Sequence, residues 1–264
     1  MKKTTLIITI FIATFVFSGA TYGGPEVMSP GPAPATASST INWTGFHLGV
    51  FGGYIRGHIE PELSLGGVFN QIPPLKSALE SRGSEDFDSD GGELGGLVGF
   101  DYQINKWVIG FECSGGYLWS RGSTDTGAFV LGGGVPPLEI RASLVTHYLS
   151  TFAPRIGYAV GRFLPYVTGG LAVGDLDWSQ KLHDLAPPGG RLAGNTTETN
   201  GGWMVGGGVQ YALTDNWSAR VQYQFVDLGS VSFDSTVNNS PTFTGHLSGG
   251  LEEHHATFGL IYKF

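Results

Sequence analysis

The feature that most constrains this chain is an alternation of apolar residues with polar or small ones that repeats along most of its length. In the stretch ELGGLVGFDYQI, even positions carry Leu94, Val98 and Phe100, whereas odd positions carry Glu93 and Asp101. A period of two is that of a β-strand, because successive side chains point to opposite faces of the sheet. The pattern therefore predicts strands that each have one apolar face.

The alternation recurs in segments separated by connections of two kinds. We count eight segments: 43–60, 91–104, 107–124, 143–161, 163–179, 199–214, 217–234 and 251–264. Two-residue turns fall at 105–106, 161–162 and 215–216, whereas the connections at 61–90, 125–142, 180–198 and 235–250 are long and polar. Short and long connections alternate in this way around transmembrane barrels, with the short turns on the periplasmic side. The sequence predicts an all-β fold, an eight-stranded antiparallel transmembrane up-and-down β-barrel.

Composition agrees with a sheet that has one face in lipid. Charged residues make up 14% of the chain, below the roughly 25% of an average soluble domain. The sequence has no run of 18 apolar residues, so it predicts no spanning helix. A closed barrel suits hydrocarbon because it pairs every strand edge.

The start of the chain predicts export. Lys2 and Lys3 precede an apolar stretch and the small residues Ser18, Gly19 and Ala20, which is the pattern of a secretory signal peptide. The expected organisation is a signal peptide at 1–20, a disordered linker or periplasmic tail at 21–41, and an outer-membrane β-barrel at 42–264. The expected location is the cell outer membrane.

Charge and cysteine content narrow the partners. Removing Lys2 and Lys3 from 14 basic residues leaves 12 against 22 acidic ones, a net charge of −10. An acidic chain without a basic patch repels nucleic acid, so we expect no nucleic-acid partner. Cys113 is the single cysteine, which excludes an internal disulfide, and its parity predicts an apolar filler on the lipid face.

Aromatic residues near the segment ends predict two interfacial girdles. Trp107, Trp217 and Phe264 lie toward the short turns, and Trp119 and Trp203 lie toward the long connections. The remaining tryptophans, Trp43 and Trp178, lie off the apolar parity, so their strands are expected to bulge or to end before them.

The opposite parity is expected to face the lumen. It contains His47, Asp101, Gln103, Glu112, Arg155, Tyr166, Gln210, Arg220, Gln222, Gln224 and Lys263. The interior of an eight-stranded barrel is only wide enough for side chains, and charges buried there must pair. We predict a lumen network of Asp101, Glu112, Arg155, Arg220 and Lys263, with salt bridges among the first four and no wide pore. A small ion channel along this polar column is the alternative.

The histidines do not predict a metal or haem site. His254 and His255 are adjacent, so on a strand they point to opposite faces and cannot share a metal. We expect them, together with Glu252 and Glu253, at the polar loop-side end of the last strand. The spacing of His58, His183 and His246 marks no haem site, and no metal or cofactor is predicted.

One short pattern suggests catalysis. His246 and Ser248 share a strand parity, and Glu252 and Glu253 follow, which resembles the His/Ser/acid arrangement of outer-membrane lipid A deacylases. The match is only three residues long, and the two glycines that follow it, Gly249 and Gly250, are typical of a loop. The chain is therefore predicted not to be an enzyme, with deacylation kept as an alternative. In the first long connection, 75–80 predicts a helical turn and the acidic run at 85–90 a solvated loop or a cation site.

Several stretches together form a recognisable pattern. They are the opening WTGFHLGVFGGY at 43–54, then QINKWVIGFE, YVTGGLAVG, GGWMVGGGVQYALTDNWSARVQYQFVDLG and the final FGLIYKF. These stretches resemble the porin-like outer-membrane β-barrel family, the small immunogenic or haem-binding outer-membrane proteins of Gram-negative bacteria. The opening is similar to the family's W-T-G-F-Y start, with His47 in place of an aromatic. The family defines no catalytic residues.

The resemblance implies an eight-stranded barrel with exposed antigenic loops, whose terminal Phe264 is read by the barrel-assembly machinery. Implied partners are outer-membrane lipid, lipopolysaccharide and host surface molecules. Some members are described as haem-binding or as contributing to envelope integrity. We therefore expect a structural, surface-facing protein that supports envelope integrity. The alternatives are a narrow channel or haem-uptake protein and, third, a lipid A deacylase.

Overall fold

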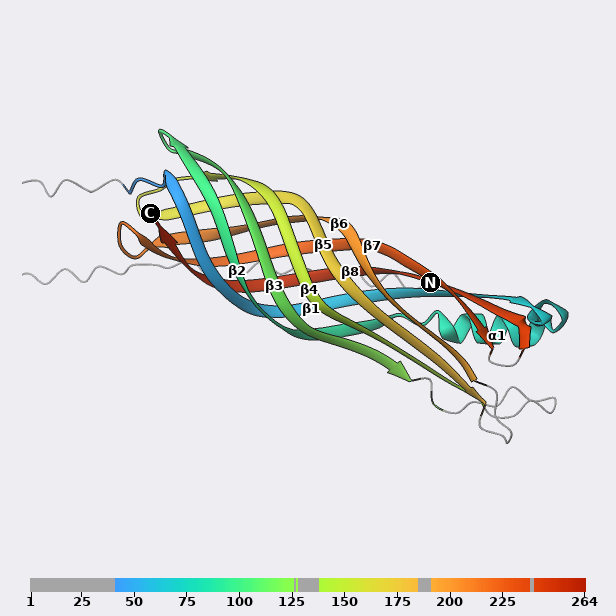
Figure 1. The fold of residues 1–264 in the computed structure, drawn as a ribbon. Coiled ribbons are helices and arrows are strands. Elements are labelled where there is room, and N and C mark those ends of the chain that lie inside the picture. The colour runs from blue at the N-terminus through green and yellow to red at the C-terminus, as the bar shows by residue number, and fades with distance from the viewer. Residues whose placement is uncertain (1–40, 126, 128–137, 185–190, 238–239) are drawn as a thin grey trace, which may run out of the picture. The chain divides into compact units, whose positions relative to one another are not determined.

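The computed structural model describes residues 41–125, 127, 138–184, 191–237 and 240–264, and in these it forms a closed antiparallel barrel (Figure 1). Its strands are β1 (Gly45–Gly67), β2 (Phe87–Ile104), β3 (Trp107–Asp125), β4 (Leu138–Tyr158), β5 (Phe163–Asp184), β6 (Arg191–Ala212), β7 (Trp217–Val237) and β8 (Ser240–Lys263). The predicted fold class is confirmed. The predicted signal peptide and nearly all of the predicted linker lie outside the described residues.

The last strand closes the ring against the first. β8 pairs with β1 from His47 opposite Lys263 to Gly67 opposite Phe243, and its other edge pairs with β7. The backbone N–H of Phe264 donates to the carbonyl of Phe46 at 2.9 Å. The C-terminal strand is therefore held along both edges.

The tight turns mark one end of the barrel, which we call the turn end, and α1 lies toward the other, the far end (Figure 1). Asn105 and Gly161 have φ of 58° and 61°, the left-handed conformation that such turns require. The predicted turns at 105–106 and 161–162 are confirmed. The third turn occupies 213–216, two residues more than predicted, because β6 already ends at Ala212.

The strands continue well beyond the predicted segments. They are 18 to 24 residues long, about twice the ~9–11 that cross a bilayer. Parts of all four predicted long connections are strand, namely 61–67, 87–90, 138–142, 180–184, 191–198, 235–237 and 240–250. These stretches are rich in Gly, Ser, Thr and Asp, a composition that is typical of turns. In the structure they are paired as strands of the sheet. The first connection contains a 3-10 turn, Val68–Gln71, and the helix α1, Pro73–Gly83, which confirms the predicted helical turn.

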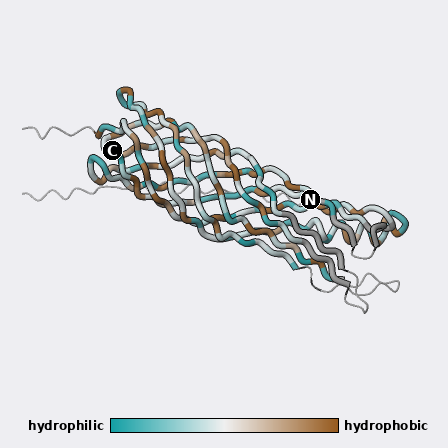
Figure 2. Tube along the Cα trace, viewed as in Figure 1, coloured by the Kyte–Doolittle hydropathy of each residue, from teal (hydrophilic) through white to brown (hydrophobic). Residues whose placement is uncertain are grey.

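The outer face carries an apolar band over the turn-end half, and hydropathy alternates along these strands (Figure 2). Aromatic pairs lie at both limits of this band. Toward the turn end they are Trp107–Tyr158 and Trp217–Tyr262, and toward the far end Tyr117–Trp119 and Trp203–Phe225. Phe264 is also exposed on this face. No helix in the described ranges is long and apolar enough to cross a membrane.

The two remaining tryptophans point inward. Trp43 is buried just before β1 begins, as its parity predicts. Trp178 is buried within β5, which runs through it to Asp184, so the expectation that this strand bulges or ends first is wrong. The irregularity in this pairing lies on β4, between Val145 and Leu149. Trp178 faces inward because the far half of the lumen has an apolar core.

Candidate functional site: the filled lumen

Four charged side chains from four strands meet in the turn-end half of the lumen. Arg155 Nε donates to Asp101 Oδ1 at 2.9 Å, and Arg155 Nη1 lies 3.4 Å from Glu112 Oε2. Arg220 Nη1 donates to the same Glu112 oxygen at 2.7 Å. The structure thus brings Asp101, Glu112, Arg155 and Arg220 together. Two carboxylates balance two guanidiniums, which compensates the cost of burying each charge.

Polar and aromatic groups surround this cluster. His47 contacts both carboxylates, with Nε2 3.4 Å from Glu112 and Nδ1 3.5 Å from Asp101. The Tyr166 ring lies beneath both guanidiniums, 5.1 Å and 6.0 Å from their central carbons. The Tyr166 hydroxyl donates to Gln222, whose amide donates to Gln224 at 3.1 Å. The network therefore continues along the lumen as neutral hydrogen bonds.

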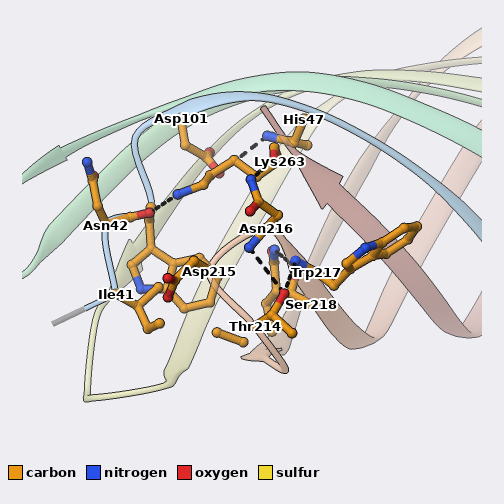
Figure 3. Close-up of a pocket in the computed structure, with 13 residues that line it drawn as sticks. Ile41, Asn42, His47, Asp101, Thr214, Asp215, Asn216, Trp217, Ser218 and Lys263 are labelled. Atoms are coloured by element: carbon orange, nitrogen blue, oxygen red, sulfur yellow. Dashed lines mark hydrogen bonds and ion pairs between the residues drawn. The ribbon is translucent and has the colours of Figure 1, made fainter. Parts of the chain in front are cut away.

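Lys263 does not join the cluster. Its ammonium donates to the backbone carbonyl of Asn42 at the mouth of the turn end (Figure 3). Lys263 occupies the last inward position of β8, where the amine can reach solvent. The sequence correctly predicted that Lys263 faces inward. The predicted contact of Lys263 with the charged cluster is absent, because its ammonium lies at the mouth of the barrel.

The mouth at the turn end is itself closed. Ile41, Trp43, Val108, Ala159, Leu164 and Ala212 form a buried apolar cluster there. Ile41, the last residue of the predicted tail, is buried in this cluster. Between these residues and the charged cluster lies a cavity of about 10 Å³, room for one water molecule (Figure 3).

The far half of the lumen is apolar, which sequence reasoning missed. Its core includes Ile55, Ile59, Leu118, Leu149, Leu176, Trp178, Met204, Val226, Leu228 and Leu251. On β1 the signal is a change of apolar parity. Even positions up to Tyr54 are exposed apolar residues, whereas from Ile55 onward the odd positions are buried apolar ones. A change of parity without a bulge means that the outside environment changes from apolar to aqueous at this level.

A buried histidine lies between the two halves. His255 Nδ1 is 3.0 Å from Glu93 Oε1, and Nε2 is 3.3 Å from Glu253 Oε2. All three side chains are buried, so the expectation that His255 and Glu253 lie at a polar strand end is wrong. The reason is that β8 begins as early as Ser240, which makes these positions mid-strand. His254 points outward against Tyr223, as the alternation predicts.

The other candidate ligands lie on the outer face and remain apart. His246 Nδ1 is 2.8 Å from Asp234 Oδ1, and both side chains are exposed. The acid beside His246 is thus Asp234, and neither Glu252 nor Glu253. The described side chains include no group of three or more His, Cys, Asp or Glu arranged for a metal ion. The side chain of His183 lies outside the described part of β5, and Cys113 is a free thiol on the outer face, opposite Val98.

A group of three charged side chains, Arg56, His58 and Asp88, lies just beyond the apolar band. His58 Nδ1 is 2.9 Å from Asp88 Oδ1, and Arg56 Nη2 donates to Asp88 Oδ2 at 2.9 Å. The hydrogen bond to Asp88 raises the pKa of His58 above its ordinary value. Hydrogen bonds from His58 and then Arg56 lower the pKa of Asp88. The acidic run at 85–90 is therefore partly strand, and Asp88 pairs with β1 side chains.

Comparison with known proteins identifies the family. The model of the outer membrane protein beta-barrel domain matches residues 31–264. The chain belongs to this outer-membrane β-barrel family. It is 30% identical over 261 residues to the 31 kDa outer-membrane immunogenic protein of Brucella melitensis, covering 98% of this chain and 99% of that protein. It is 23% identical to the 25 kDa outer-membrane immunogenic protein of Brucella abortus, covering 100% of each chain.

Among solved structures, the chain is similar to OprG from Pseudomonas aeruginosa, with 13% identity, a TM-score of 0.41 and coverage of 84% of this chain and 97% of that one.

Membership of the outer-membrane β-barrel family places the apolar band of this protein in lipid. The turn end is then periplasmic and the far end extracellular. The expected location in the cell outer membrane is confirmed.

Proposed function

We propose that this protein is a closed structural barrel that supports the integrity of the outer membrane and holds its extracellular extension at the cell surface. The observation that carries the proposal is a lumen filled at three successive levels. Ile41 and Trp43 fill the periplasmic mouth, the Arg155 cluster fills the middle, and the Leu118–Leu228 level is apolar. Packed interiors rigidify a barrel and leave no continuous aqueous path.

The apolar level argues against the channel alternative. An ion that crosses the polar half would next have to enter a region of buried aliphatic side chains and Trp178. Transfer of an unpaired charge into such surroundings is strongly unfavourable. Planar-bilayer recording of the purified protein tests this directly, and we expect no discrete conductance steps. Discrete steps from the wild-type protein would overturn the closed-barrel proposal.

We also propose that the protein has no catalytic activity. His246 and Ser248 share the outer face of β8, but the acid beside the histidine, Asp234, is 85% exposed, so water screens the pair. The described structure assigns no hydrogen bond between His246 and Ser248, which a nucleophile and its base require. Mass spectrometry of lipid A from cells that express wild type or Ser248→Ala tests this. A difference between the two profiles would favour deacylation.

The extracellular extension is the part proposed to contact antibodies or host molecules. It consists of the strand ends beyond the membrane band together with α1, whose Leu79 packs into the barrel core and anchors the helix. Two relatives are named immunogenic outer-membrane proteins, which supports exposure of this region. Intact cells treated with an antibody against the α1 peptide should be labelled, whereas an antibody against the turn at 213–216 should label only permeabilised cells. The reverse pattern would contradict the orientation.

A further inference from the structure

The barrel wall has an unpaired seam between β6 and β7, beyond the membrane band. The ladder between these strands ends at Trp203 opposite Asp227, and they meet again near their tips, where Leu192 is opposite Val237. Between these positions, no described residue of β6 pairs with β7. In an antiparallel sheet, every second residue of a strand directs its N–H and carbonyl toward the same neighbour. Each side of the seam therefore presents a row of backbone groups that lack a strand partner.

The seam opens at a bulge of β7. The register against β8 shifts between Asp227 and Ser230, and Gly229 has a φ of 69° there. A bulge bends its strand and disrupts the ladder locally. Asn200 Nδ2 donates to the Leu228 carbonyl at 3.3 Å, so a side chain replaces part of the lost ladder. On their other edges the two strands stay paired, β6 with β5 and β7 with β8, which keeps both sides of the seam in strand conformation.

A comparable edge on β1 is covered. β1 extends beyond the start of β2, so its last residues lack a strand on that side. There the Leu63 N–H donates to Ser84 Oγ at 2.9 Å, and the Leu65 N–H donates to Glu80 Oε1 at 2.8 Å. Free sheet edges are usually covered in this way because they pair readily with other chains. α1 is the one α-helix of the described ranges, and its place at the β1 edge leaves the β6–β7 seam without a helical cover.

Small side chains leave the backbone of the seam accessible. The exposed ones on its two sides are Thr197, Thr199, Gly201, Gly229, Ser230 and Ser232. Glu198 has the inward parity of β6 and is opposite the buried Leu176, yet Glu198 is exposed. Water therefore reaches the inner face of β6 at this level.

Acidic side chains flank the seam on the outer face. Asp227 and Asp234 lie on β7, and Asp177 lies on the neighbouring strand β5. The described side chains of 197–202 and 227–234 include no Lys or Arg. A basic partner is therefore attracted to this edge, whereas a second copy of the chain would bring the same acids and be repelled.

We propose that the free edge of β6 binds an extended segment of a partner protein by strand addition, and that this segment alternates basic with apolar residues. A polypeptide strand offers both donors and acceptors at the period of the edge. Its outward side chains would lie near Asp177 and Asp234, and its inward ones near the buried Leu176 and Leu228. The proposal rests on the proposed surface role of the extracellular extension, and it identifies the backbone edge that makes the contact.

The test measures binding of synthetic peptides to the full-length protein in detergent micelles by fluorescence anisotropy. The probe is an end-capped, dye-labelled peptide of about ten residues that alternates lysine and valine, which matches the unpaired length 193–202. Two control peptides carry N-methyl groups, one on every lysine amide and the other on every valine amide. Each methylation removes the hydrogen-bond donors from one edge of the peptide strand and keeps its charge. At least one control should bind at least tenfold more weakly than the probe, and equal binding of all three would overturn the proposal.

Hydrogen exchange locates the binding site. The bound probe should slow amide exchange within 193–202 at least tenfold and leave Leu63 and Leu65 unchanged, because the α1 region already holds their N–H groups. Unchanged exchange within 193–202 would overturn the proposal. Sedimentation of the protein without peptide should show a monomer, and self-association that the probe disrupts would instead assign the edge to a second copy.

A pair of double variants tests the choice of a basic partner. Asp227→Asn/Asp234→Asn should bind the probe at least threefold more weakly than wild type. Glu60→Gln/Glu62→Gln is the matched control, because it removes two exposed carboxylates from β1 where that strand is paired with β8, and its affinity should stay within twofold. An equal loss in both would reduce the effect to general surface charge and overturn the proposal. Heat-modifiable gel mobility and circular dichroism establish folding, and conductance decides the closed-barrel proposal separately.

Discussion

Arg155 on β4 donates to Asp101 on β2 at 2.9 Å over Gly110 of the intervening strand β3, which joins two strands that are not neighbours in the sheet. Both side chains are almost fully buried. This pair is a strut between β2 and β4 that adds to the hydrogen bonds each of them makes with β3. Removing only one of the two charges is expected to destabilise the protein, because the other charge stays buried without its partner.

We therefore expect Asp101→Asn to destabilise the protein by about 3–5 kcal/mol, because it leaves the Arg155 charge buried and only partly compensated. The double replacement Asp101→Leu/Arg155→Leu should cost less than the single change, since no charge remains unpaired. Urea unfolding in detergent, followed by tryptophan fluorescence, measures both. A double variant less stable than Asp101→Asn would contradict this account of the strut.

The apolar extracellular core should respond as a soluble-protein core does. Leu118→Ala and Leu228→Ala each remove a fully buried side chain, and each is expected to cost about 2–5 kcal/mol. Leu94→Ala removes the same atoms from the lipid-facing surface and should cost clearly less, because lipid fills the space. Equal losses at Leu118 and Leu94 in urea titrations would show that the extracellular lumen is not packed.

The contact between His58 and Asp88 should make stability depend on pH in a defined window. The folded pKa of His58 is raised, so its contribution is present below the unfolded value of about 6.5 and is lost as pH rises through the folded pKa. The folded pKa of Asp88 is lowered, so its contribution is present above about 3.9 and is lost as pH falls through the folded pKa. The contact between His58 and Asp88 therefore adds most to the stability of the folded protein between about pH 3.9 and pH 6.5.

We expect His58→Gln to be slightly less stable than wild type at pH 5.5 and equal to it at pH 9. The effect should be small because both side chains are substantially exposed and solvent screens them. Unfolding of the two proteins at each pH provides the comparison. A stability difference between wild type and His58→Gln that grows from pH 5.5 to pH 9 would contradict this prediction.

Phe264→Ala should impair assembly in cells more than folding in detergent. The Phe264 ring is exposed at the periplasmic rim, whereas its backbone N–H to Phe46 survives the substitution, so refolded stability should change little. If the assembly machinery reads the terminal aromatic residue, the amount of folded protein in the outer membrane should fall severalfold. Phe163→Ala, an exposed aromatic on β5, is the matched control. An equal loss of folded protein from the outer membrane in Phe264→Ala and Phe163→Ala would contradict a special role of Phe264 in assembly.

Local alternation was sufficient to predict much of this architecture. The number of strands, the lipid face at Leu94 and Val98, and the tight turns at 105–106 and 161–162 all follow from a period of two interrupted by turn residues. The same parity placed Asp101, Glu112, Arg155 and Arg220 inside. Because a barrel of this size has no room for unpaired charges, their contact could be inferred without coordinates.

The extracellular half could not be inferred in this way. Ile55 and Tyr54 are adjacent apolar residues on opposite faces, and a pattern of period two does not say which face meets lipid, water or core. That choice depends on the height of each residue relative to the membrane, which is set by pairing between strands far apart in sequence. The same long-range pairing turns Gly- and Ser-rich stretches into strand, and it buries Trp178 and His255. Alternation along the chain therefore specifies the two faces of each strand, whereas closure of the ring specifies what each face touches.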